Sequence, residues 1–390
     1  MGGFNTPIAG GKTILEKSAV EMASIFESVT DVDYLALFIQ NTLPTSFASS
    51  VFNRPELSSS KAFNILSNSN LSADKVQAIL YNIPFSSRLI DILTANASDY
   101  TVSTNSTITG VNRYRTLTVN TGVTLSLAGQ PAVLIANTLN NNGTITKTTT
   151  GGSGGLSSGT KSGGNGGGGK IILCNYLSNS GTISANGENG SVYSGSITSG
   201  TAGGTGSFHI ITGDNAGTGG NANGYNPGTG GVNGGGGGGP SSSSYAGGSG
   251  GGSSTTSYTN SSSITTTIIK AVIDNFIVNV IGKNPSSTVS LPNFYGSGGG
   301  GAGYTSGYTY GGGGGGGGEI ISIYVSLNNT GTIMANGGNG ASGTYSTGGG
   351  GGGGIVYVFY NTLINQGTIQ ANGGTGYQAG TSGTVRAIAI

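Results

Sequence analysis

A short phrase, Asn-x-Gly-Thr-Ile, recurs four times in this chain, each time just after an apolar, β-branched run. The copies centre on Thr144, Thr182, Thr332 and Thr368. Their glycines are separated by 38 residues, then 150, then 36. A recurring unit that contains a strand is typical of stacked, solenoid-like architectures, in which neighbouring units bury one another's apolar faces. The spacing of 150, close to four units, indicates a long insertion within the array.

Each unit is predicted to consist of a strand, a turn, a second short strand and a glycine-rich loop. The long strands are expected in four runs: AVLIANTL from Ala132, KIILCNYL from Lys170, IISIYVSL from Ile320 and IVYVFYNTLI from Ile355. The segment YRTLTVNTGVTLSLAG from Tyr114 is expected to begin the stack, and GTVRAIAI from Gly383 to open one further unit. In the second run, Ile171 and Leu173 alternate loosely with Ile172 and Asn175, which predicts a strand with one buried face.

Glycine accounts for 80 of the 390 residues and follows no strict Gly-X-Y period. If the glycine tracts are ordered, we expect extended polyglycine of the polyproline II type, which has no internal hydrogen bonds. Gly311–Gly318 would span roughly 25 Å at a rise of about 3.1 Å per residue. Such a strand satisfies its amides only by bonding to neighbours of the same kind. The tracts therefore predict a layer of polyglycine II segments that accompanies the β-repeats.

Charged residues divide the chain into parts of different character. Residues 1–100 hold 6 Lys/Arg and 9 Asp/Glu, whereas the remaining 290 residues hold only 8 and 4. We therefore expect an α-helical module at 1–100, a first β-repeat region at 101–212, a Gly/Ser/Tyr-rich insertion at 213–301 and a second β-repeat region at 302–390. The fold class is mainly β, preceded by a small all-α module.

Within the module, apolar spacing predicts four or five short helices. The first has Leu15, Ala19, Met22, Phe26 and Val29 along one face. A second runs from Val32 to Asn41 after an Asp31 cap; a third follows Ser72; and a fourth opens at Ser86 or Ser87. We interpret the module as a base for attachment or assembly. The alternative is a cap that only shields the first repeat from solvent.

No apolar run is long enough to cross a bilayer, and the first residues lack the apolar stretch of a secretory signal. Cys174 lies in a predicted buried strand and is expected to act as a small apolar residue. His209 has no partner at metal-ligand or triad spacing. Gly10–Thr13 resembles a phosphate loop but lacks the first glycine and a preceding strand. We predict no metal, no cofactor and no nucleic-acid partner.

Carboxylates are scarce after residue 100, where only Glu188, Asp214, Asp274 and Glu319 occur. Glycoside hydrolysis needs two acids about 5 to 10 Å apart. Glu188 and Asp214 are the one pair expected to approach each other, because Glu319 is better explained as the start of a strand. The prediction is that the chain is not an enzyme, with a glycan hydrolase as the alternative.

After residue 100, tyrosines within glycine- and serine-rich segments are the feature most typical of a binding surface. Such residues give contact area at low entropic cost and adapt to a partner, as in antibody paratopes, and tyrosine rings also stack on sugars. Packing over polyglycine or between subunits is the alternative. The candidate contact residues are Tyr304, Tyr308 and Tyr310, ahead of the longest glycine run, together with Tyr245, Tyr258, Tyr345 and Tyr377.

The stretches GGGGKIILCNYLSNSGTISANGENG and GGGGGIVYVFYNTLINQGTIQANGGTG resemble the glycine-rich β-helical repeats of surface adhesins and of viral tail fibres or spikes. The glycine tracts resemble those of phage tail-tip adhesins built from stacked polyglycine helices. The resemblance covers residues 114–390. It implies a virion surface protein that binds a host glycan or protein, commonly as a trimer, and contacts other virion proteins through residues 1–100.

Two features bear on this expectation. The helical module and the insertion from about Gly213 to Gly301 depart from a regular fibre. A chain with so few titratable groups also offers little for acid to act on, which favours an acidic habitat and an archaeal virus. The alternatives are a structural subunit of a cellular filament or surface layer, a glycan-hydrolysing spike, and an ice-binding protein.

Overall fold

The computed structural model describes residues 16–83, 86–147, 170–190, 192–194, 255–257, 288–290, 309–311, 317–342, 348–376, 379–380 and 382–389. The chain divides into two compact units. Unit 1 comprises Met1–Ser98 with Ile264–Gly282, and unit 2 comprises Asp99–Ser263 with Lys283–Ile390. Unit 2 begins at Asp99, within two residues of the boundary at residue 100 that the distribution of charged residues predicts.

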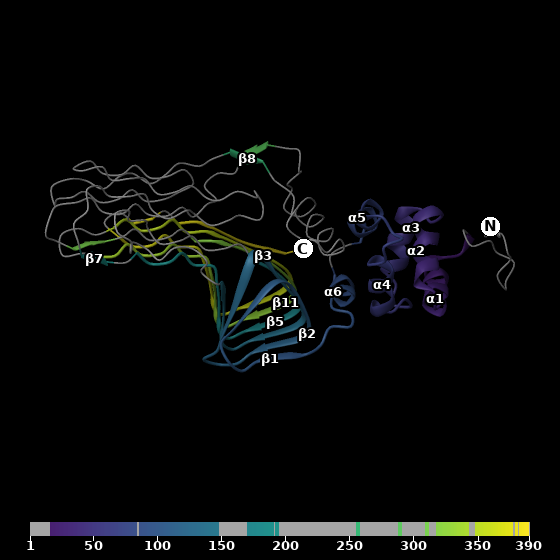
Figure 1. Ribbon diagram of the computed structural model, residues 1–390, viewed down its shortest axis with the longest axis horizontal. Helices are drawn as coiled ribbons and strands as arrows, with labels where there is room; N and C mark the ends of the chain where they lie inside the picture. The colour runs from purple at the N-terminus through teal and green to yellow at the C-terminus, as the bar shows by residue number, and fades with distance from the viewer. Residues whose placement is uncertain are drawn as a thin grey trace. The chain divides into compact units, whose positions relative to one another are not determined.

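Unit 1 contains six described helices, drawn in purple and blue in Figure 1. They are α1 (Ala19–Ser28), α2 (Val32–Asn41), α3 (Thr45–Phe52), α4 (Ser59–Leu66), α5 (Ala73–Tyr81) and α6 (Ser87–Leu93). The prediction for α2 and its Asp31 cap is confirmed. Helix α1 begins at Ala19, later than predicted, because Ser18 and Glu21 form a capping box there. Helices α3 and α4 were missed, so the predicted total of four or five helices was wrong.

These helices form a repeat of 13 to 14 residues. Each of the first four packs against the helix two places further along the chain, in the pairs α1·α3, α2·α4, α3·α5 and α4·α6. In the last three helices a basic side chain donates to a carbonyl near the C-terminal end of the helix three places earlier. These bonds join Lys61 to Val29 O, Lys75 to Leu43 O and Arg88 to Phe52 O. Arg88 also donates to Leu57 O, which lies just before α4. A cation there also complements the partial negative charge of a helix C-terminus.

Unit 2 contains an 11-stranded sheet whose strand pairs are all parallel. Its strands are β1 (Tyr100–Val102), β2 (Ser106–Val119), β3 (Thr124–Asn141), β4 (Thr144–Lys147), β5 (Lys170–Asn179), β6 (Thr182–Ser184), β11 (Glu319–Asn329), β12 (Thr332–Met334), β13 (Ile355–Asn365), β14 (Thr368–Gln370) and β15 (Thr384–Ala389). Two small antiparallel pairs accompany it: β7 (Val192–Ser194) with β10 (Thr309–Gly311), and β8 (Thr255–Ser257) with β9 (Thr288–Ser290).

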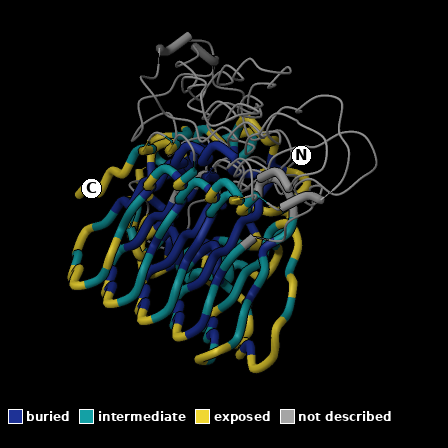
Figure 2. Tube along the Cα trace, turned by 90° about the vertical axis from the view of Figure 1, so that its left-hand side faces the viewer, coloured by how far each residue is buried: buried dark blue, intermediate teal, exposed yellow. Residues whose placement is uncertain are grey.

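Successive repeat copies lie side by side as rungs, each with a long strand, a turn and a short strand (Figure 2). The long strands pair in the order β3, β5, β11, β13, β15, and the short strands in the order β4, β6, β12, β14. The register offset equals the sequence spacing: Ile135 pairs with Leu173, and Leu173 pairs with Ile323. Because β5 pairs directly with β11, no rung lies between the second and third copies, and their spacing of 150 residues, against 38 and 36 elsewhere, contains an insertion. Strand β15 is the predicted opening of one further rung.

The interior of the stack consists of columns of equivalent apolar residues. Ile145, Ile183 and Ile333, from the short strands, are each 0% exposed. The same core cluster contains Ile172 and Cys174. The prediction that β5 has only one buried face was wrong, because Ile171 and Leu173, which lie outside this cluster, are also buried. Near-continuous apolar runs of this kind are typical of parallel strands covered on both faces.

A ladder of asparagine side chains runs through the same rungs. Asn141 Nδ2 donates to Asn179 Oδ1, Asn179 Nδ2 to Asn329 Oδ1, and Asn329 Nδ2 to Asn365 Oδ1, each at 2.7 Å. The first three side chains are buried. These are the asparagines that open the four copies of Asn-x-Gly-Thr-Ile. The ladder therefore connects one rung to the next at a fixed register.

The glycine of the same phrase is required by close stacking of the turns. A Cβ on Gly181, Gly331 or Gly367 would lie 2.0 to 2.1 Å from the carbonyl oxygen of the equivalent glycine one rung earlier. None of the three has a φ in the left-handed region. The repeat thus needs glycine here for lack of space between backbones rather than for a special backbone conformation.

Strands β6, β12 and β14 are each followed by an extended glycine-rich segment, and these segments lie side by side (Figure 1). We call residues 185–190, 317–318, 335–342, 348–354 and 371–376 the glycine layer. Gly348, Gly351 and Gly354 donate to the carbonyl oxygens of Ala341, Gly338 and Ala335 at 2.9, 2.9 and 2.7 Å. Donors therefore recur every third residue, the period of a helix with three residues per turn.

One surface ion pair lies at the start of unit 2. Arg115 Nε donates to Asp99 Oδ1 at 2.8 Å, and Nη2 donates to Oδ2. These hydrogen bonds lower the pKa of the Asp99 carboxyl from 3.8 to about 2. The pair therefore stabilises the fold above the unfolded-state pKa, and this contribution is lost as the pH falls from about 4 through about 2.

We expect Asp99→Asn to lower the melting temperature slightly at pH 7, since exposed ion pairs contribute little. The difference from the wild type should disappear below pH 2, and Arg115→Met should show the same pH dependence. Thermal unfolding between pH 7 and pH 1.5 measures this, and a difference that persists at pH 1.5 would contradict the assignment.

Candidate functional site

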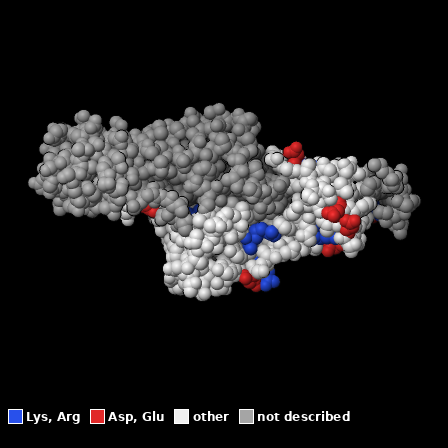
Figure 3. All heavy atoms as spheres, viewed as in Figure 1, with Lys and Arg blue, Asp and Glu red and all other residues white. Residues whose placement is uncertain are grey.

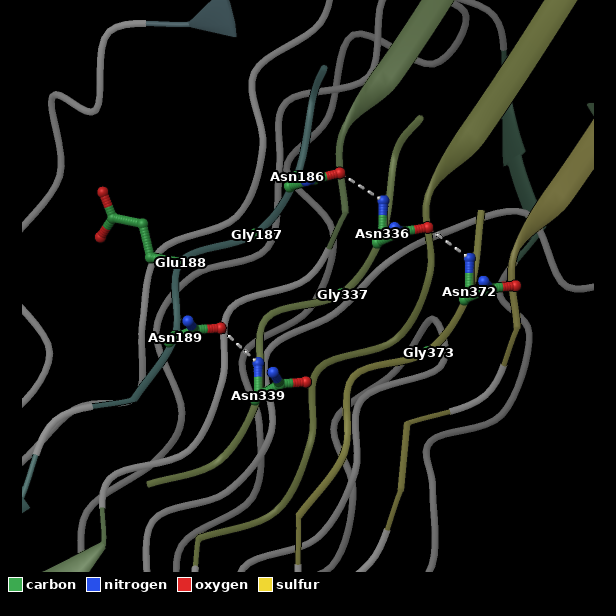
Figure 4. A pocket seen from close by; sticks show the side chains of 9 residues that line it. All are labelled: Asn186, Gly187, Glu188, Asn189, Asn336, Gly337, Asn339, Asn372 and Gly373. Atoms are coloured by element: carbon green, nitrogen blue, oxygen red, sulfur yellow. Dashed lines mark hydrogen bonds between the residues drawn. The ribbon is translucent and has the colours of Figure 1, made fainter. Parts of the chain in front are cut away.

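A groove of about 470 Å³ opens in the glycine layer (Figure 4). Three successive rungs contribute to it, through the segments that follow β6, β12 and β14. Its lining residues are Asn186, Gly187, Glu188, Asn189, Asn336, Gly337, Asn339, Asn372 and Gly373. No apolar side chain occurs in this lining. The groove is therefore a polar surface made largely of amides and peptide groups.

The asparagines of the groove stand in two columns, one residue per rung. In the first column, the backbone N–H of Asn336 donates to Asn186 Oδ1, and that of Asn372 donates to Asn336 Oδ1, both at 2.8 Å. In the second column, the N–H of Asn339 donates to Asn189 Oδ1, and that of Thr375 to Asn339 Oδ1, again at 2.8 Å. Figure 4 shows these amide oxygens pointing toward the next rung.

The three-residue period explains why the two columns share one side of the layer. Asn186 and Asn189 are three residues apart, as are Asn336 and Asn339, so each pair is separated by one turn of the extended segment. Between the columns, Gly337 allows close contact: a Cβ there would lie 2.0 Å from Gly351 O. The amides are thus held on a closely packed backbone platform.

Hydrogen bonding fixes the orientation of these amides. The oxygens of Asn189 and Asn339 each accept a backbone N–H of the neighbouring rung. Their nitrogens are consequently the groups left to act as donors toward the groove. Both side chains are exposed. The second column therefore offers a row of hydrogen-bond donors to a molecule in the groove.

Glu188 is the ionisable residue of the lining. Figure 4 shows its carboxylate pointing away from Asn336 and Asn339, at the edge of the groove. Most of the described surface of the face in Figure 3 is uncharged.

The predicted tyrosine contacts fall almost entirely outside the described residues. Tyr310 lies in β10, where its backbone pairs with Tyr193 of β7. The other candidates lie outside the described ranges: Tyr245, Tyr258, Tyr304, Tyr308, Tyr345 and Tyr377. Their role as a binding surface stays a prediction.

Some of the other candidate residues lie within the described ranges and some lie outside them. Cys174 is a buried free cysteine, as predicted, and burial raises the pKa of its thiol, which keeps it protonated. Glu319 begins β11, as expected. His209, Asp214 and Asp274 lie outside the described residues. The acid pair proposed for hydrolysis thus has one described member, Glu188.

The described residues contain no group of three or more His, Cys, Asp or Glu side chains that could bind a metal ion. Among the described helices, none combines the length and apolar character needed to span a membrane.

The groove asparagines were not singled out from the sequence, although a signal for them was present. The copies GTISANGENG, GTIMANGGNG and GTIQANGGTG align Asn186, Asn336 and Asn372 at one position and Asn189, Asn339 and Thr375 three residues later. A polar residue that recurs every third position within glycine indicates one side of a three-fold helix.

Comparison with family models, with curated proteins and with solved structures returned no match for this chain.

Proposed function

We propose that this chain is a virion surface fibre or spike protein that attaches to a host-cell surface through the glycine layer and its tyrosine-rich loops. The fold that we infer is a glycine-rich β-solenoid with polyglycine II segments. Support for the solenoid comes from parallel rungs whose register offsets equal the repeat spacings. Support for polyglycine II comes from donors that recur every third residue between close-packed glycine backbones.

The observation that carries the proposal is the polar groove, lined by amides and one carboxylate, on a closely packed backbone platform. Binding sites are most accurate when rigid elements position them, and loops on a rigid scaffold commonly carry recognition. A surface built from peptide groups, amides and tyrosines suits a glycan or a protein receptor rather than a nucleic acid, which needs clustered basic residues.

The two units differ in composition, which supports different roles for them. We infer that the helical unit binds other virion proteins and that unit 2 forms the head. A homotrimer is the oligomer that the resemblance of the repeats to viral fibres favours.

Binding of the full-length protein to intact host cells tests the attachment proposal. Labelled wild-type protein should bind saturably, and a variant with Tyr304→Ala, Tyr308→Ala and Tyr310→Ala should bind about 30-fold more weakly, since central aromatic contacts contribute about 2 kcal/mol or more. Tyr176→Ala is the matched control, because Tyr176 is 56% exposed on β5.

Equal losses of cell binding in the tyrosine variant and in the Tyr176→Ala control would overturn the assignment of the contact loops. Absence of saturable binding by the wild type to any cell surface would overturn attachment itself.

A further inference from the structure

We propose that the helical unit binds, at its α1–α2 end, a helix of another virion protein whose apolar stripe is flanked by lysine or arginine. This inference rests on the proposed function, in which unit 1 contacts other virion proteins, and it names the surface and the chemistry of the partner. We call Val20, Tyr34 and Leu37 the docking face. All three are exposed apolar side chains, and Tyr34 and Leu37 are 47% and 46% exposed.

The repeat of the helices shows which way this face points. The second or third residue of every described helix occupies one position of the repeat: Val20, Tyr34, Phe47, Lys61, Lys75 and Arg88. In the last three helices, this side chain reaches back to a carbonyl near the end of the helix three places earlier. The first three helices have no described helix in that place. Val20 and Tyr34 therefore face the open end of the helical array, where a further helix can continue the packing.

Leu37 is an exception at its own position of the repeat. At the equivalent position the other helices carry small or polar residues: Ala23, Ser50, Asn64, Ala78 and Asp91. Leu37 lies three residues after Tyr34, so the two side chains share one face of α2. A helical array that ends against solvent normally has a polar outer face, whereas aromatic residues are enriched at protein interfaces. The docking face thus indicates contact with another helix.

The charge around this face determines the chemistry of the partner. Residues 16–34 hold five acidic residues and one lysine, whereas residues 35–98 hold three acidic and four basic residues. In Figure 3, acidic side chains lie over α1 and α2. Asp31 and Asp33, next to Tyr34, accept hydrogen bonds from the Tyr34 N–H and from Asn68 Nδ2, which are neutral groups. Complementary charge on the partner therefore means lysine or arginine beside its apolar stripe.

A second copy of the chain fits the docking face poorly. In a two-fold symmetric dimer the same patch of both subunits meets, so Asp31 and Asp33 would approach the acidic residues of the other copy. Such juxtaposition of like charges disfavours the contact. The occupant is therefore a different protein.

The test uses the full chain and two synthetic peptides of about 20 residues, long enough to form a helix. Both peptides carry the same leucine stripe; one is flanked by lysine and the other by glutamate. In fluorescence titrations at low salt, the lysine peptide should bind at least about tenfold more tightly than the glutamate peptide. This preference should shrink as salt is added.

The apolar contacts are tested by Tyr34→Ser combined with Leu37→Ser. We expect this variant to bind the lysine peptide about 30-fold more weakly, since central aromatic contacts dominate interfaces. Tyr81→Ser is the matched control, because Tyr81 is 46% exposed on α5, outside the docking face. Its binding should equal that of the wild type.

The charges are tested by Asp31→Asn combined with Asp33→Asn. Asparagine keeps the oxygen that accepts each hydrogen bond and removes the charge. Binding of the lysine peptide at low salt should fall about three- to tenfold. Glu56→Gln combined with Asp74→Asn removes the same charge elsewhere in unit 1 and should change binding by less than about twofold.

The outcomes separate this inference from attachment. Equal binding of the two peptides, or unchanged binding by the Tyr34 and Leu37 variant, would overturn the docking face. If that variant instead dissociates an oligomer of the wild type in sedimentation experiments, the occupant is a second copy, and the basic partner is wrong. Binding to host cells belongs to unit 2 and should be unchanged in all these variants. If the wild type binds the lysine peptide as expected but not host cells, attachment fails and the docking face stands.

Discussion

Gly337→Ala is expected to destabilise unit 2 by about 3 kcal/mol or more, at the upper end of the cost of overpacking. The new Cβ would lie 2.0 Å from Gly351 O and 2.5 Å from Gly351 C. Both contacts are with backbone, so rotation of a side chain cannot relieve them. The neighbouring segment must move away, and that movement breaks the bonds of Gly351 and Gly354 to Gly338 and Ala335. We expect a fall in melting temperature of roughly 6 °C or more.

The measurement is thermal unfolding combined with amide exchange of residues 335–341 and 348–354, which should lose protection in the variant. Gly122→Ala separates crowding from backbone strain. Gly122 has a φ of +75° and open space around its Cβ position. Its replacement should cost only about 1 to 2 kcal/mol, from the left-handed conformation. If Gly337→Ala costs no more than Gly122→Ala, the close packing of the glycine layer is wrong.

Asn179→Leu is expected to destabilise unit 2 by about 2 to 4 kcal/mol, because it leaves buried polar groups of both neighbours without their partners. Asn141 Nδ2 loses Asn179 Oδ1 and keeps a contact at 3.1 Å with Thr182 O. Asn329 Oδ1 loses the donor that lies 2.7 Å away. The replaced side chain is itself 1% exposed, so water cannot substitute for the lost bonds.

Asn365→Leu is the matched control at the end of the ladder. Asn365 accepts one ladder bond from Asn329 Nδ2 and is exposed. Its replacement should cost about 1 kcal/mol or less. Denaturant unfolding of both variants measures the two free energies. Equal costs would show that the ladder does not connect the rungs as a continuous network.

Much of unit 2 could be predicted because one phrase carries several of the constraints on a rung. In Asn-x-Gly-Thr-Ile, the isoleucine enters the interior column, as Ile183 and Ile333 do. The glycine permits the turns to stack, as at Gly331. Spacing between copies then equals the register of the strands, as in the pairing of Leu173 with Ile323. The role of the asparagine was not foreseen, since a ladder depends on which neighbour each side chain meets.

Other features could not be predicted for physical reasons. Helix α3 follows Pro44 with no side-chain cap, so the usual start signal is missing. The burial of Ile171 depends on what covers the second face of the sheet, which alternation within one strand cannot show. The position of Asn339 in the groove could be recognised only from the three-residue period of the glycine layer. Glu188 was noticed as a scarce acid, but its position at the edge of a groove depended on how three rungs align.

The central claim, attachment by a virion surface protein, is tested most directly by immunogold electron microscopy with antibodies raised against the full chain. The antibodies are applied to purified virus particles and to uninfected cells from the same culture. We predict gold confined to the tails or projecting spikes of the particles. Gold spaced along filaments or over the envelope of uninfected cells would contradict the proposal and indicate that the repeats form a structural lattice.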